Sequence, residues 1–156
     1  MKTELATFAA GCFWHVQWSF DQVKGVVSTR VGYTGGHTVN PSYDDVCSDA
    51  TGHAEAVEIT FDPSKVSYGQ LLDVFWKEHD PTTPNRQGPD VGSQYRSAIF
   101  YHNDSQRKTA ERSRDAHQKT SDKRIVTEIV KSGPFYAAEE YHQKYFQKTG
   151  KRVCGI

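Results

Sequence analysis

Hydrophobic and polar residues alternate along residues 53–61 with the period of two that is typical of a β-strand. On one face of this predicted strand, every second position carries a large hydrophobic residue: Val57, Ile59 and Phe61. Glu55 falls on the same face, in phase with them. Because that face is expected to pack against the core, the pattern predicts a buried carboxyl group at residue 55.

The rest of the chain shows alternating strand and helix patterns. Strands are expected at 5–10, 26–33, 94–101 and 125–130. Helices are expected at 12–23, 67–79 and 136–148, with a short helix after Pro41 and a long polar helix that Asn103 or Asp104 caps and that runs to about residue 121. This order favours an α/β or α+β fold in two layers, built as one domain over 1–156.

Composition narrows the class of protein. The chain has 156 residues, with 19 lysines and arginines against 19 aspartates and glutamates, so no net charge favours nucleic acid or an anionic membrane as a partner. It has no secretory signal pattern and no apolar run of about 18 residues, and we expect a monomeric cytoplasmic protein. The cysteines are too few and too widely spaced for structural zinc or a disulfide-stabilised secreted fold: Cys12, Cys47 and Cys154.

Cys12 lies where the first predicted strand ends and the first predicted helix begins. Unpaired backbone N–H groups at a helix N-terminus favour an anion, so this position lowers the pKa of a thiol toward that of a reactive thiolate. Phe13 and Trp14 follow, and because adjacent helical residues do not share a face, one ring is expected beside the thiol, where it suits a methyl group. Ordinary burial of the thiol and ordinary packing of the rings are the alternatives.

The predicted burial of Glu55 has a chemical consequence, because a buried carboxyl group has a raised pKa and acts as a general acid near neutral pH. The alternative is that Glu55, close to the start of its strand, reaches solvent or pairs with Arg30 or Arg96. The run from His53 to Glu55 matches half of a zinc-deaminase signature, but the P-C-x-x-C half is absent. The seven histidines have no metal-ligand spacing, so no metal site is expected.

Two segments, 34–52 and 80–93, are too long for plain connections and are candidates for function. Tyr43 and Tyr95, in or beside them, carry hydroxyl groups that donate hydrogen bonds without charge, and Asp90 is placed to order the second segment or the site. The tail at 149–156 is expected to be mobile, and a thiol on it suits a resolving role, in which Cys154 attacks a sulfenic acid. Cys47 is a weaker candidate, and a structural role is the alternative for each residue.

Ordered motifs along nearly the whole chain, from about residue 5 to residue 145, resemble those of the peptide methionine sulfoxide reductase A family. They are Gly11-Cys12-Phe13-Trp14, Gly32-Tyr33-Thr34-Gly35-Gly36, Asn40-Pro41-Ser42-Tyr43, Thr51-Gly52-His53-Ala54-Glu55, His79-Asp80-Pro81-Thr82-Thr83, Asp90-Val91-Gly92-Ser93-Gln94-Tyr95-Arg96-Ser97 and Glu140-Tyr141-His142-Gln143. The sequence departs from the usual family residues at four positions: His15, Gln17, Asp49 and Pro89. None of these departures removes a catalytic group.

The resemblance implies a fold and an activity. The fold is an α+β, two-layer ferredoxin-like sandwich with a mixed sheet and long coil segments. The activity is reduction of the S epimer of methionine sulfoxide, free or in peptides and proteins, with Cys12 as the nucleophile and Glu55 as the proton donor. No metal or organic cofactor is implied.

The resemblance also implies roles for the other candidates. Tyr43, Tyr95 and Asp90 are implied as contacts to the sulfoxide oxygen or to water, and the methyl pocket is formed by two rings, Phe13 and Trp14. Cys154 resembles the first resolving cysteine of the family. A disulfide between Cys12 and Cys154, reduced by thioredoxin, is therefore implied.

Two other classes of function remain open from the residues alone. In a cysteine hydrolase, Cys12 acts with a histidine such as His53 as its base, and an acyl-enzyme is formed. In a binding module for peptides or methionine sulfoxide, the thiols are inert. A buried acid and a cysteine on a tail fit neither class well.

Overall fold

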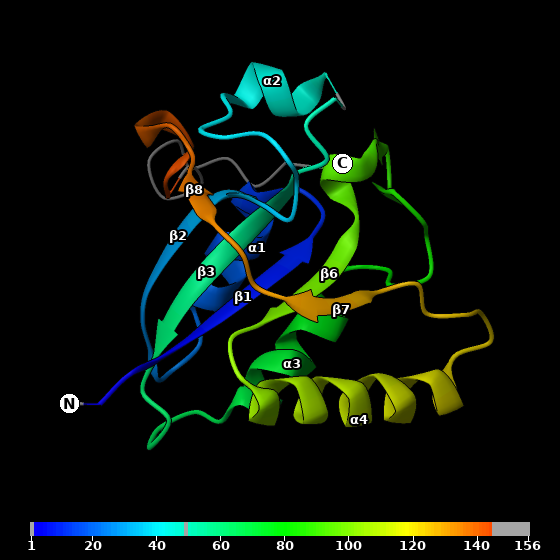
Figure 1. Cartoon of the computed structure of the whole chain (residues 1–156). Helices are drawn as coiled ribbons and strands as arrows, with labels where there is room; N and C mark the ends of the chain where they lie inside the picture. Colours follow the sequence, from blue (N-terminus) through cyan, green and yellow to red (C-terminus); the bar gives the residue numbers. More distant parts are fainter. Residues whose placement is uncertain (1, 49, 145–156) are drawn as a thin grey trace.

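A six-stranded, curled mixed sheet forms the centre of the protein, whose computed structural model describes residues 2–48 and 50–144. The strand order is β7-β6-β1-β3-β2-β8, and all neighbours are antiparallel except β6 and β7 (Figure 1). The strands are β1 (Glu4–Ala10), β2 (Val26–Thr34), β3 (Ala54–Phe61), β6 (Ser97–Tyr101), β7 (Glu128–Lys131) and β8 (Phe135–Ala137). With its helices the protein is therefore an α+β fold.

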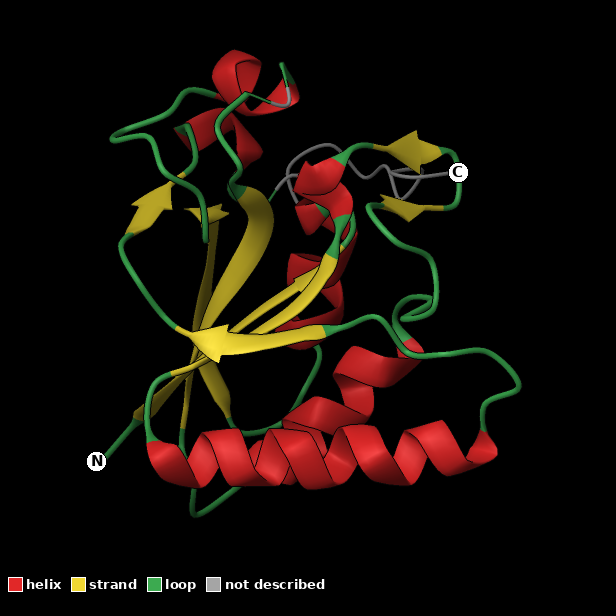
Figure 2. Ribbon diagram, turned by 45° about the vertical axis from the view of Figure 1, so that its right-hand side comes forward, coloured by secondary structure: helices red, strands yellow, loops and turns green. Residues whose placement is uncertain are grey.

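The helices bury one face of this sheet. The main core joins the face of β3 that carries Val57 and Ile59 to α1 (Phe13–Asp21) and α3 (Tyr68–Lys77). The long helix α4 (Asp104–Thr120) packs on α3 at the edge of the molecule and buries Ala110 there (Figure 2). In the part of the chain that the structure describes, no helix has the length and apolar character to cross a membrane.

Short elements fill the two long segments. The first contains α2 (Tyr43–Cys47), which begins with a capping box in which Ser42 and Asp45 exchange hydrogen bonds. The second contains a small hairpin of β4 (Arg86–Gln87) and β5 (Asp90–Val91), followed by the 3₁₀-helix η1 (Ser93–Tyr95). A second 3₁₀-helix, η2 (Glu140–His142), follows β8.

Most of the predicted elements are confirmed, with small shifts at their ends. α1 begins one residue later than expected, so Cys12 is its N-cap. A short helix does follow Pro41, and Asn103 caps α4 by accepting a hydrogen bond from the backbone of Gln106. β7 begins at Glu128, three residues after the predicted start.

Two predictions are wrong, and tertiary contacts explain both. The stretch predicted as a helix from residue 136 holds β8 and η2 as far as residue 144, because the outer edge of β2 pairs with β8 at residues 32–34. The strand predicted from residue 94 begins at Ser97. Gln94 and Tyr95 lie in η1 instead, which starts after Gly92 at a φ of 139° that favours glycine.

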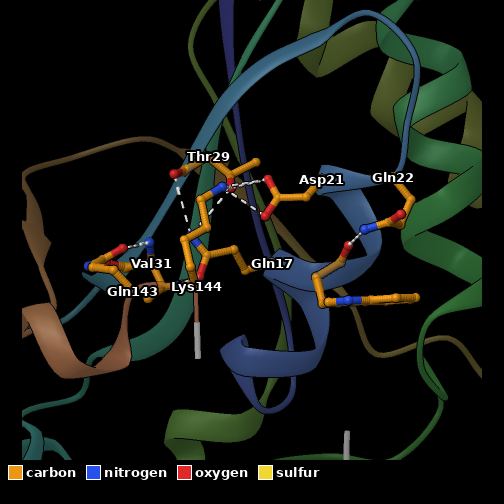
Figure 3. Close-up of polar contacts among 8 residues, drawn as sticks. Gln17, Asp21, Gln22, Thr29, Val31, Gln143 and Lys144 are labelled. Carbon is orange, nitrogen blue, oxygen red and sulfur yellow. Dashed lines mark hydrogen bonds and ion pairs between the residues drawn. The ribbon is translucent and has the colours of Figure 1, made fainter. Parts of the chain in front are cut away.

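Polar side chains hold the segment at 138–144, which we call the strap, against β2 and α1. The amide of Gln143 takes the place of a strand partner, since it accepts from the N–H of Val31 at 3.0 Å and donates to its carbonyl at 2.9 Å. The ammonium group of Lys144 contacts both carboxylate oxygens of Asp21 at 2.7 Å and the hydroxyl of Thr29 at 2.8 Å (Figure 3). The strap is thereby fixed to the helix that Cys12 caps.

We predict that Gln143→Leu lowers the free energy of unfolding by about 2 kcal/mol and the melting temperature by about 4–8 °C, because it leaves the N–H of the buried Val31 without an acceptor. Urea and thermal unfolding measure both effects. Gln22→Leu is the control, since the exposed Gln22 makes one bond to a carbonyl of its own helix, and it should change stability by less than about 0.5 kcal/mol. Equal effects of the two substitutions would contradict this role of the strap.

Candidate active site

The ends of four strands meet at one edge of the sheet. Ala10, the last residue of β1, lies opposite Ser97, the first residue of β6, and Tyr33 near the end of β2 lies opposite Glu55 near the start of β3. Because these pairs are antiparallel, the residues that follow β1 and β2 and those that precede β3 and β6 gather on the side of α2 (Figure 1). Both long segments therefore border the same place.

Cys12 caps the N-terminus of α1 and is partly buried. Its sulfur is disulfide-bonded. The preceding Gly11 has a φ of 90°, and a Cβ atom there would lie 2.8 Å from the side chain of Gln87 in the β4–β5 hairpin. A glycine is thus needed for both the turn and the close approach of the hairpin beside the cysteine.

Glu55 is buried beside Cys12, with 1% of its surface exposed. One carboxylate oxygen accepts from the backbone N–H of Phe13 at 3.3 Å, and the other accepts from the amide of Gln94 at 2.8 Å. Burial raises the pKa of Glu55 to about 7, the charge of Asp90 adds to the rise, and the two hydrogen bonds oppose it. The group therefore holds its proton close to neutral pH.

The alternative partners of Glu55 are wrong. Arg30 pairs with Glu58 at 2.7 Å, and Arg96 pairs with Glu128 at 2.7 Å. The predicted burial of the carboxyl group is therefore confirmed, and neither arginine offsets its charge.

Tyr43, Tyr95 and Asp90 surround the same carboxyl group. Burial raises the pKa of both tyrosines, and the charge of Glu55 raises them further, so both hydroxyls are neutral donors at ordinary pH. The two tyrosines are hydrogen-bonded to each other, and Tyr43 also bonds to the exposed Cys47. Burial also raises the pKa of Asp90, whose Oδ2 has no hydrogen-bond partner in the described structure.

An aromatic cluster lies next to this group. Phe13 is buried, and its ring centroid lies 5.7 Å from that of Tyr33 and 6.4 Å from that of Tyr43. Trp14 is partly exposed, and its indole N–H donates to Nδ1 of His142 at 2.9 Å. Phe13 and Trp14 thus differ in exposure, as their adjacent positions on the helix predict.

Three residues of the site have no role in the sequence-based prediction. Gln94 binds Glu55, and its amide also lies 3.5 Å from the sulfur of Cys47. Glu139 accepts from the hydroxyl of Tyr33 and from the backbone of Tyr43, each at 3.0 Å. The third is His142. Gln94 and His142 lie within the family motifs, which is the one signal in the sequence that points to them. The pattern of hydrophobic residues does not identify any of the three, because their neighbours depend on the positions of η1 and the strap.

The remaining sequence candidates lie elsewhere or outside the described residues. His53 accepts from the N–H of Gly36 at Nδ1 and contacts the carbonyl of Thr38 through Nε2 at 2.8 Å, so neither ring nitrogen is free to act as a base on Cys12. Residues 2–48 and 50–144 contain no cluster of three or more side chains that could hold a metal ion. Cys154 lies outside the described residues.

We predict that Glu55→Gln gains stability relative to the unsubstituted protein as the pH rises from 5 to 8, by about 2–3 kcal/mol. Since the pKa of Glu55 is raised from 4.5 to about 7, the native carboxyl contributes stability that is full below pH 4.5 and is lost as the pH rises through 7. A glutamine stays neutral and shows no such loss. Urea unfolding at both pH values tests this, with Glu58→Gln on the same strand as the control. A pH-independent difference would mean that residue 55 is ionised throughout.

Comparisons with known proteins agree over nearly the whole chain. A family model described as peptide methionine sulfoxide reductase matches residues 4–156. The peptide methionine sulfoxide reductase MsrA of Methanothermobacter thermautotrophicus is 61% identical over 155 residues, which cover 98% of this chain and 92% of that protein.

Solved structures give the same result. Mxr1 from Saccharomyces cerevisiae in its reduced form is 36% identical, with a TM-score of 0.93 over 98% of this chain and 90% of that one. Mxr1 in complex with Trx2 is 26% identical, with a TM-score of 0.66 over 92% and 85% of the two chains. The protein belongs to the peptide methionine sulfoxide reductase A family.

Proposed function

We propose that this protein reduces the S epimer of methionine sulfoxide, free or in peptides and proteins, to methionine. One observation carries the proposal: a buried carboxyl group, Glu55, is held by the N–H of Phe13, the residue next to Cys12. The cysteine, whose thiol the reduced protein would carry, and a proton donor are thus neighbours. The relatives named as peptide methionine sulfoxide reductases support this substrate class.

The first step needs both groups. The thiolate of Cys12 attacks the sulfoxide sulfur and forms an S–S bond, while Glu55 donates a proton to the oxygen. The oxygen then moves, as a hydroxyl group, to the sulfur of Cys12, and both the S–O bond to methionine and the new S–S bond break, which leaves methionine and a sulfenic acid on Cys12. The substrate sulfur is reduced and the cysteine sulfur is oxidised. Tyr43 and Tyr95, which interact electrostatically with Glu55, are our candidates for the groups that donate to the oxygen while negative charge develops on it. We assign to Asp90, whose Oδ2 has no hydrogen-bond partner in the described structure, a contact to the sulfoxide oxygen or to water.

The apolar end of the substrate binds the aromatic cluster. We place the methyl group against Phe13 and Trp14, whose rings contact Tyr33, Tyr43 and His142. Such a surface excludes water and so strengthens the hydrogen bonds to the sulfoxide oxygen.

Cys154 is our candidate for the resolving step. Its thiolate attacks the sulfenic acid sulfur, a disulfide forms and water leaves. The last described residue, Lys144, is bound to α1, and the ten residues from there to Cys154 span up to about 33–36 Å, against about 14 Å for the length of α1. We propose thioredoxin as the reductant, and the complex of yeast Mxr1 with Trx2 supports this partner.

We also propose that the core has the ferredoxin-like arrangement and forms a single, monomeric and cytoplasmic catalytic domain. The order β6-β1-β3-β2, with α1 between β1 and β2 and α3 between β3 and β6, supports this arrangement. The strands β7 and β8 extend the sheet at its two edges.

We predict that Cys12→Ser abolishes reduction, whereas Cys154→Ser releases one methionine per enzyme molecule and then stops without a thiol reductant. Mass spectrometry after excess methionine sulfoxide measures methionine release and identifies the disulfide. Cys47→Ser should still form the disulfide between Cys12 and Cys154. If Cys154→Ser is recycled normally by thioredoxin, Cys154 is not the resolving cysteine.

We predict that Glu55→Gln slows single-turnover reduction by about 10²–10⁴-fold, because it removes the general acid. In the unsubstituted protein the rate should fall as the pH rises above about 7, where Glu55 loses its proton, and this fall should be absent in Glu55→Gln. Glu58→Gln is the matched control and should keep the rate and its pH dependence. A rate in the unsubstituted protein that does not change with pH would exclude the acid role of Glu55.

A further inference from the structure

The hydrogen bond between Trp14 and His142 fixes the tautomer of the imidazole. An indole N–H only donates, so Nδ1 of His142, at 2.9 Å from Trp14 Nε1, must carry a free lone pair. Burial lowers the pKa of His142, so the ring is neutral at ordinary pH. The single ring proton therefore lies on Nε2.

That Nε2–H has no acceptor in the described part of the chain. His142 is 2% exposed, and its Nε2 is buried without a hydrogen-bond partner among the residues that the structure describes. Buried donors in native proteins are almost always paired, because an unpaired one has lost its hydrogen bonds to water without replacement. An unpaired donor in a candidate active site indicates that the missing acceptor belongs to a ligand.

The surroundings of His142 indicate which ligand. Its ring centroid lies 4.4 Å from that of Tyr43, 5.3 Å from that of Phe13 and 5.5 Å from that of Trp14. These are the side chains that, in the function proposed above, hold the sulfoxide group. Glu139, the acidic residue whose charge acts on His142, already accepts from Tyr33 and from the backbone of Tyr43.

We propose that Nε2–H of His142 donates a hydrogen bond to an oxygen of the bound substrate. This inference rests on the proposed function and adds a neutral, substrate-contacting donor to it. Two substrate oxygens have the required chemistry, the sulfoxide oxygen and a peptide carbonyl. Trp14 then has two roles, since its ring faces the methyl group and its N–H keeps the proton of His142 on the nitrogen that faces the ligand.

Two substitutions of His142 separate the effect of losing the Nε2–H donor from the effect of losing the hydrogen bond to Trp14. In His142→Asn the short amide lies near the position of Nδ1 and can accept from Trp14, but no donor remains near Nε2. In His142→Gln the longer amide places an N–H near Nε2. We expect His142→Asn to lower kcat/KM by about 10–100-fold and His142→Gln by less than about fivefold. His117→Asn, which alters a similar histidine–tryptophan contact with Trp76 far from the site, is the control and should change nothing.

The substrates distinguish the two oxygens. A loss in His142→Asn with both dimethyl sulfoxide and an N-acetylated methionine sulfoxide amide assigns the sulfoxide oxygen, whereas a loss with the amide alone assigns the peptide carbonyl. Wild-type kcat/KM in His142→Asn, or an equal loss in His142→Gln, overturns the proposal. An unsubstituted protein inactive on both compounds would instead contradict the proposed function.

A binding measurement covers the case in which these variants do not fold. In Cys12→Ser, which keeps His142 but does not turn over, the ¹H resonance of His142 Nε2–H should move downfield when dimethyl sulfoxide or the methionine sulfoxide amide is added. A resonance that stays in place at saturating concentrations of both compounds overturns the proposal.

Discussion

The burial of one carboxyl group, Glu55, is the constraint on which the rest of the site depends. Burial raises its pKa and two donated hydrogen bonds, from Phe13 and Gln94, lower it, so that the value stays at about 7. No lysine or arginine of the described residues is among the groups that shift this pKa. A lysine or arginine in contact with Glu55 would lower its pKa, and the ionised carboxylate would then have no proton to donate near pH 7.

This balance between burial and hydrogen bonding at Glu55 requires segments that are far apart in the sequence to meet at the site. The donor from Phe13 exists because α1 begins directly after β1, and the donor from Gln94 exists because η1 precedes β6. The strap is the third segment that borders the site. It is held there by the hydrogen bond between Trp14 and His142 and by the bonds that Glu139 accepts from β2 and α2. Lys144, at a left-handed φ of 56°, accepts backbone strain that its contacts to Asp21 and Thr29 offset.

Much of this fold could be predicted from the sequence, because the alternation of hydrophobic residues and the capping residues determine where most strands and helices lie. The phase of Glu55 with Val57 predicts its burial, and Asn103 predicts the start of α4. The strap could not be predicted in this way: the stretch from residue 136 is predicted as a helix, but the free edge of β2 pairs with β8, and Gln143 binds Val31. The roles of Gln94, Glu139 and His142 depend on partners 39 to 128 positions away in sequence, which no local period reveals.

The protonation states of the site favour one class of ligand. Burial raises the pKa of Tyr43 and Tyr95 and lowers that of His142, so all three are neutral near pH 7. None of the three donors carries a positive charge that would stabilise an anion, and Glu55, which holds its proton up to about pH 7, supplies none either. A sulfoxide is neutral overall but has a strongly negative oxygen, so in the proposed function it accepts hydrogen bonds from these donors without the help of a cation. The same burial that gives Glu55 its proton therefore leaves these donors uncharged, which in the proposed function favours a neutral substrate over a carboxylate or a phosphate.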